Sequence, residues 1–124
     1  MKSAIRITEA EWEVMSVVWR RGPVAAAAIV RELHQTRRWT LATVRTLLRR
    51  LVNKGALAQQ LDGKRFLYTA QVSMEACVHR ESESFWDRVL GRAPAVALVH
   101  LVERADLSKA EIQELRRILR NKEK

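Results

Sequence analysis

The spacing of apolar residues changes once within the first seventy residues, and this change limits the possible fold more than any other feature. Apolar side chains recur every three or four positions in residues 9–21, 24–35 and 41–54, which predicts three amphipathic helices. After Gly55 the spacing becomes that of two short strands around Asp62-Gly63-Lys64, and Asp-Gly is a strong signal for a hairpin. We therefore expect three helices followed by a β-hairpin.

The ends of these helices carry their own local signals. Thr8 and Glu11 have the spacing of a capping box, in which each side chain accepts a hydrogen bond from the other residue's backbone. Thr40 is a suitable N-cap for the third helix, and Gly55 suits the position just after its end. Three helices and a hairpin in this order predict a winged helix-turn-helix DNA-binding domain over residues 1–70.

The rest of the chain is predicted to be helical again. One helix is expected from Ser73 to about Leu90, and Ala93-Pro94 opens the next because proline suits the first helical position. Residues 95–102 are apolar nearly all round, so this helix must be covered on every side. Residues 108–111 form a second capping box and begin the last helix. The chain is thus predicted to be mainly α, with a three-helix dimerisation domain over residues 71–124.

The positive charge of the chain lies almost entirely in its first part. Residues 1–70 carry 13 Lys and Arg against 5 Asp and Glu, a balance of +8, whereas residues 71–124 carry 10 against 9, a balance of +1. Such a distribution indicates that the first part meets a polyanion, and we expect double-stranded DNA rather than an anionic membrane. A winged helix that serves only as a protein-interaction module is the alternative. With no signal peptide and no long apolar run, we expect a cytoplasmic protein without membrane insertion.

The residue types that support catalysis or metal binding are few and scattered. Cys77 is the single cysteine, which excludes an intrachain disulfide and a multi-cysteine metal cluster, and we expect it to be buried. His34 and His100 lack metal-ligand partners four positions further on, and His79 lies two residues from Cys77, so the two point apart on a helix. No glycine-rich phosphate loop is present. We therefore expect no enzymatic activity, no metal and no cofactor.

The third predicted helix combines a buried stripe with a polar side suited to DNA. Arginine offers a bidentate fork to guanine and also reaches phosphates, while threonine can bond to bases or contact a thymine methyl group. The alternative is a basic helix face that only contacts solvent. The candidate DNA-reading residues of this helix are Thr43, Arg45, Thr46, Arg49 and Arg50.

Two further pairs of basic residues flank this helix. Arg37 and Arg38 precede it and can hold phosphates near its N-terminus, a position that favours anions. Lys64 and Arg65 follow the Asp-Gly turn and would form a wing tip against the DNA backbone or minor groove, unless they are merely solvated.

Several stretches of this sequence resemble the BlaI/MecI penicillinase-repressor family, which also includes the CopY copper repressors. The clearest are residues 7–15, ITEAEWEVM, and residues 43–51, TVRTLLRRL, followed by Lys54-Gly55. Near the C-terminus, residues 102–108 and 111–115 are also similar to family segments. The similarity covers nearly the whole chain.

The resemblance implies a homodimeric repressor that binds an inverted repeat with TACA/TGTA-like half-sites. It implies that Thr43 and Arg45 read bases, and that a membrane-bound metalloprotease sensor triggers cleavage within the C-terminal domain. This chain departs from the family in two ways. CopY proteins carry paired cysteines near the C-terminus, whereas Cys77 is the single cysteine here. The penicillinase branch is cut at an Asn-Phe bond, whereas this chain has His100-Leu101 at that place. His100-Leu101 is therefore the candidate cleavage site, with a packed interface position for His100 as the alternative.

Overall fold

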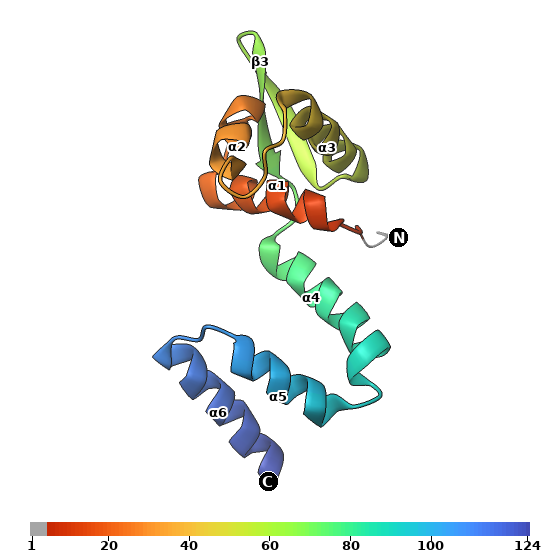
Figure 1. Ribbon diagram of the computed structural model, residues 1–124, viewed down its shortest axis with the longest axis vertical. Helices are drawn as coiled ribbons and strands as arrows, with labels where there is room; N and C mark the ends of the chain where they lie inside the picture. Colours follow the sequence, from red (N-terminus) through yellow and green to blue (C-terminus); the bar gives the residue numbers. More distant parts are fainter. Residues whose placement is uncertain (1–4) are drawn as a thin grey trace. The chain divides into compact units, whose positions relative to one another are not determined.

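A computed structural model describes residues 5–124 and contains the expected helices and hairpin, together with one strand that the sequence did not predict (Figure 1). Its contacts divide the chain into two compact units, one ending at Ser82 and the other spanning Glu83–Lys124. The first unit consists of α1 (Glu9–Arg21), β1 (Val24–Ala25), α2 (Ala26–Leu33), α3 (Leu41–Lys54), β2 (Leu57–Asp62), β3 (Arg65–Ala70) and most of α4 (Met74–Phe85). The prediction of a mainly helical chain with a winged-helix fold is confirmed.

Local hydrogen bonds set the ends of the helices as the sequence predicts. The Thr8 hydroxyl accepts from the Glu11 amide at 3.2 Å and the Glu11 carboxylate accepts from the Thr8 amide at 2.9 Å, which completes the capping box of α1. Thr40 caps α3 by accepting from the Thr43 amide at 3.2 Å. Gly55 ends α3 with a φ of 86°, a left-handed conformation that side chains with a Cβ rarely adopt.

The sheet has one strand more than the expected hairpin. Val24–Ala25, predicted as the start of the second helix, instead forms β1 and pairs antiparallel with β3, so the strand order is β1-β3-β2. Val24 lies opposite Tyr68, and both are buried. The predicted helix start was wrong because pairing with β3 satisfies this segment's backbone, an interaction that apolar spacing within the segment does not reveal.

The core of the first unit lies between the first three helices and the sheet, and the β2–β3 hairpin, which we call the wing (Leu57–Ala70), projects beyond the helices (Figure 1). The Trp19 Nε1 atom donates to the Val72 carbonyl at 2.9 Å, and the Trp19 and Trp12 rings pack edge to face, with their centres 5.4 Å apart. Cys77 of α4 is buried against the same core, as expected. The main core residues are Val14, Met15, Val17, Val18, Ile29, Leu33, Val44, Leu47, Leu48, Leu51, Leu57 and Tyr68.

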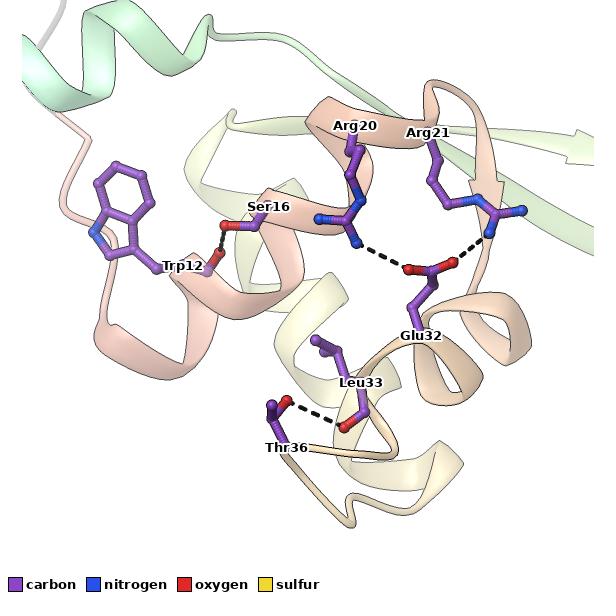
Figure 2. Close-up of polar contacts among 7 residues, drawn as sticks. All are labelled: Trp12, Ser16, Arg20, Arg21, Glu32, Leu33 and Thr36. Atoms are coloured by element: carbon purple, nitrogen blue, oxygen red, sulfur yellow. Dashed lines mark hydrogen bonds and ion pairs between the residues drawn. The ribbon is translucent and has the colours of Figure 1, made fainter. Parts of the chain in front are cut away.

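Charged side chains connect α1 to α2 at the surface. Arg20 and Arg21 at the end of α1 each bond to a different carboxylate oxygen of Glu32, at 2.9 and 2.5 Å (Figure 2). The hydrogen bonds from the two guanidinium groups lower the pKa of Glu32. Because both arginines are largely exposed, this network contributes little to the stability of the fold. At the end of α2, the Thr36 hydroxyl donates to the Leu33 carbonyl at 3.4 Å (Figure 2).

A second ion pair joins the start of α1 to the end of α3, and here the acid is buried. The Glu11 side chain is 1% exposed, and its Oε1 accepts from Lys54 Nζ at 2.5 Å. Lys54 Nζ also donates to the Arg6 carbonyl at 2.7 Å, while Glu11 Oε2 has no hydrogen-bond partner in the part of the chain that the structure describes. Burial raises the pKa of Glu11, but the bonds from Lys54 and Thr8 together bring it below its ordinary value.

The second unit contains the end of α4, the π-helix η1 (Trp86–Leu90), α5 (Pro94–Arg104) and α6 (Lys109–Glu123). Gly91 follows η1, and the expected capping box between Ser108 and Glu111 opens α6. Leu90 is buried, but α5 and α6 bury no residue in the single chain. The domain boundary expected after residue 70 stays a prediction. Across residues 5–124, no helix has the length and apolar character needed to cross a membrane.

Candidate nucleic-acid interface

Helix α3 packs one side against the core and turns the other side outward. Val44, Leu47, Leu48 and Leu51 are buried, which confirms the predicted apolar stripe. Of the candidate DNA-reading residues, Thr43, Arg45, Arg49 and Arg50 are exposed, and Thr46 is half-buried.

A hollow of about 640 Å³ separates part of this outer side from the wing. We call it the α3–wing hollow; its lining residues are Ala25, Ala26, Ala27, Leu41, Arg45, Arg49, Gln59, Lys64, Arg65, Phe66 and Tyr68. Four of these side chains are cationic. Among residues 5–124, Arg45, Arg49 and Lys64 form no ion pair, and Arg65 lies 3.5 Å from Asp62, which is also exposed. A concave surface with unneutralised positive charge attracts and orients a polyanion.

The candidate residues of α3 fall on two sides of the helix rather than on one face. Leu41, Arg45 and Arg49 follow one another at intervals of four and line the hollow together. At about 100° per residue, Thr43 and Arg50 lie roughly 140–160° around the helix from Arg45. The outer surface of α3 therefore has an arginine side toward the wing and a Thr43–Arg50 side away from it.

A family model described as the penicillinase repressor matches residues 7–121 of this chain. The chain belongs to the penicillinase repressor family. It is 36% identical to the methicillin resistance regulatory protein MecI of Mammaliicoccus sciuri over 116 residues, which cover 94% of each chain. It is 34% identical to the penicillinase repressor of Bacillus licheniformis over 119 residues, 96% of this chain and 93% of that protein.

A solved structure of this family matches the first part of the chain. The Bacillus licheniformis BlaI monomeric form, solved in complex with the blaP half-operator, is 36% identical, with a TM-score of 0.52. The match covers 61% of this chain and 93% of that one. The predictions of the family and of a non-enzymatic transcriptional repressor are thus confirmed, and the alternative of a pure protein-interaction module is set aside.

Both candidate threonines of α3 already use their hydroxyl groups locally. Thr46 Oγ1 donates to the Ala42 carbonyl at 3.1 Å, and Thr43 Oγ1 lies 3.1 Å from Thr40 Oγ1. A hydroxyl that donates to the backbone keeps acceptor capacity. Thr46 can therefore still accept a hydrogen bond, for example from an amino group of a base.

The two arginines before α3 have different surroundings. Arg37 lies 3.3 Å from Glu13 and 5.2 Å from the centre of the Trp39 ring, so it is already bound within the protein. Arg38 is exposed and forms no ion pair within residues 5–124. Neither lines the α3–wing hollow. Arg38 is thus the more available of the two for a phosphate.

The structure adds residues that sequence reasoning did not single out. Gln59, Leu41 and Phe66 line the hollow, as does the start of α2, where Ala25 provides no side-chain cap. The alternation of strand residues was the available signal, because Phe66 and Tyr68 share one face of β3. Only the packing of the hairpin beside α3 shows that this is the face that lines the hollow.

The remaining chemistry-bearing residues gather into no site. Within residues 5–124, no group of three or more His, Cys, Asp or Glu residues is placed to hold a metal ion. Burial raises the pKa of the Cys77 thiol, and the nearby Glu81 raises it further, so this cysteine is kept in its unreactive protonated form.

Proposed function

We propose that this repressor acts in the cytoplasm as a homodimer that binds double-stranded operator DNA at an inverted repeat with TACA/TGTA-like half-sites. The observation that carries the proposal is the α3–wing hollow, where Arg45, Arg49 and Lys64 present positive charge without an acidic partner among the described residues. A relative with the same fold was solved with a half-operator, which supports DNA as the polyanion.

Each group of candidate DNA-binding residues has a separate role in the proposed complex. Helix α3 enters the major groove, where Arg45 and Thr43 contact base edges, and Thr46, Arg49 and Arg50 contact bases or the adjoining backbone. Lys64 and Arg65 at the wing bind backbone or minor groove. Arg38 holds a phosphate ahead of α3, and Arg37 does so from its position beside Glu13.

Replacing Arg45 with alanine tests base reading. We expect Arg45→Ala to weaken binding to the cognate operator by about 1–3 kcal/mol and to relax base preference at one position per half-site, because a bidentate contact is lost. Lys64→Ala should weaken binding to cognate and random duplexes alike, since a phosphate contact carries no sequence information. Titrations of both duplexes by fluorescence anisotropy distinguish the two effects. Equal losses on both duplexes for Arg45→Ala would contradict its role as a base reader.

The second unit supports a dimer through its uncovered apolar surface. Nine large apolar side chains of α5 and α6 are exposed in the single chain: Val96, Leu98, Val99, Leu101, Val102, Ile112, Leu115, Ile118 and Leu119. Monomeric proteins rarely leave large apolar patches exposed. A second copy of the same helices would cover it in an interface of the obligate type, often about 2,000 Å² or more.

We also propose that repression ends by cleavage at His100-Leu101, triggered by a membrane-bound metalloprotease sensor. The bond lies within α5, a helix that buries no residue in the single chain, and cutting there separates α6 from the rest of the proposed dimer interface. His100 is 4.0 Å from Glu103 of the same helix. Losing the interface removes the gain in affinity that comes from tethering two half-site contacts.

Coexpression tests this cleavage. We expect the repressor, produced with the host's candidate membrane metalloprotease and its inducer, to yield a new fragment that ends near residue 100. A sensor with its metal ligands replaced is the control and should yield none. His100→Asn combined with Leu101→Phe restores the bond found in the penicillinase branch and should be cut at least as fast. Full-length repressor under conditions that relieve repression would refute the proposal.

A further inference from the structure

The wing carries two large apolar side chains that the fold leaves in solvent. Leu61 of β2 is 63% exposed and Phe66 of β3 is 41% exposed. They are cross-strand partners in the register that also pairs Gln59 with Tyr68, so all four residues share one face of the hairpin. Tyr68 is buried in the core, whereas Leu61 and Phe66 lie nearer the turn, beyond the reach of the core.

Phe66, one member of this apolar pair, lies among positively charged side chains. Phe66 lines the α3–wing hollow together with Lys64 and Arg65, and Arg45 and Arg49 face it from α3. Apolar side chains surrounded by cationic ones do not suit a neutral apolar partner. They are complementary to nucleic acid. The DNA backbone has phosphates next to deoxyribose rings, and these rings line the minor groove.

We propose that Leu61 and Phe66 form an apolar contact with deoxyribose in the minor groove beside each half-site, while Lys64 and Arg65 hold the flanking phosphates. The proposal rests on the proposed function and assigns the wing a second kind of contact. This apolar contact contributes to affinity by removing apolar surface from water, so its contribution is independent of counterion release. The contact is made to sugar and therefore strengthens binding without reading the sequence.

The dependence of affinity on salt separates this contact from the ionic ones. We expect Phe66→Ala to weaken binding to the operator duplex about tenfold at every salt concentration, with the slope of log affinity against log salt unchanged. Lys64→Ala should reduce that slope by about 0.9, the value for one phosphate contact. Phe66→Leu should retain most of the affinity, because it keeps an apolar side chain. Gln60→Ala, an exposed position on the other face of β2, is the matched control and should bind as wild type.

Hydroxyl-radical footprinting locates the contact, because the radical attacks deoxyribose from the minor groove. Wild-type repressor should protect sugars beside each half-site, and Phe66→Ala should lose that protection while thermal unfolding stays unchanged. Unaltered affinity of Phe66→Ala, or a change in slope like that of Lys64→Ala, would overturn the proposal and leave operator binding intact. A wild-type protein with no salt-dependent binding to any duplex would overturn the proposed function itself.

Discussion

Replacing Val99 with aspartate is expected to convert the repressor to a monomer and to lower its affinity for a two-half-site operator by about 10²–10⁴-fold. Val99 is 56% exposed and lies in the middle of α5. A carboxylate there must lose its water when a second copy covers the helix, and no cation of the same helix lies nearby to compensate. Analytical ultracentrifugation measures the association, and anisotropy titration measures the binding.

Two controls separate lost dimerisation from lost folding. Gln113→Asp adds the same side chain to α6 on the side away from its apolar stripe, and it should leave the dimer intact. A duplex with a single half-site should bind Val99→Asp as well as it binds wild type, because the first unit is unchanged. Sedimentation of Val99→Asp as a dimer at micromolar concentration, with full operator affinity, would disprove the assignment of this surface.

Replacing Lys54 with methionine is expected to lower the free energy of unfolding by about 3 kcal/mol at pH 7. Glu11 is buried, and its Oε2 already has no partner in the described part of the chain, so removing Lys54 leaves a buried carboxylate without a cation. The value is at the lower end of the range for a broken buried ion pair because about a third of the Lys54 side chain is in solvent. Urea unfolding followed by tryptophan fluorescence measures the change.

The effect of pH on this variant has a defined sign. In wild type the pKa of Glu11 lies below its ordinary value of 4.5, so the pair contributes stability above that value and loses it as pH falls through the lower folded pKa. In Lys54→Met burial acts without the opposing cation and raises the pKa of Glu11. The deficit relative to wild type should therefore be largest at neutral pH and should shrink as pH falls toward about 4.

A double substitution completes the test. Glu11→Gln combined with Lys54→Met should be less destabilised than Lys54→Met alone, because the neutral amide costs less to bury than an unpaired carboxylate. Lys64→Met, at an exposed lysine without an ion pair among the described residues, is the matched control and should unfold as wild type. A deficit independent of pH, or no rescue in the double variant, would show that Lys54 acts through packing alone.

The sequence alone was sufficient where structure depends on interactions between near neighbours. The capping boxes at Thr8 and Ser108 and the left-handed Gly55 were all predictable, because each is made by backbone and side chains within a few residues. Helical spacing likewise identified the buried stripe of α3. The basic candidate residues of α3 and the wing are exposed, as the sequence indicated. Their contacts with DNA stay predictions.

Only the tertiary structure decided the features that join distant segments. Val24–Ala25 becomes a strand because β3 lies beside it, and Glu11 pairs with Lys54, which is 43 positions further along the chain. Sequence spacing showed Glu11 only as a capping residue. In the same way, Arg45 and Phe66 line one hollow because the register of the wing and the packing of α3 bring them together. Local periodicity determines which face of an element is apolar, but the close packing of all the elements determines what that face meets.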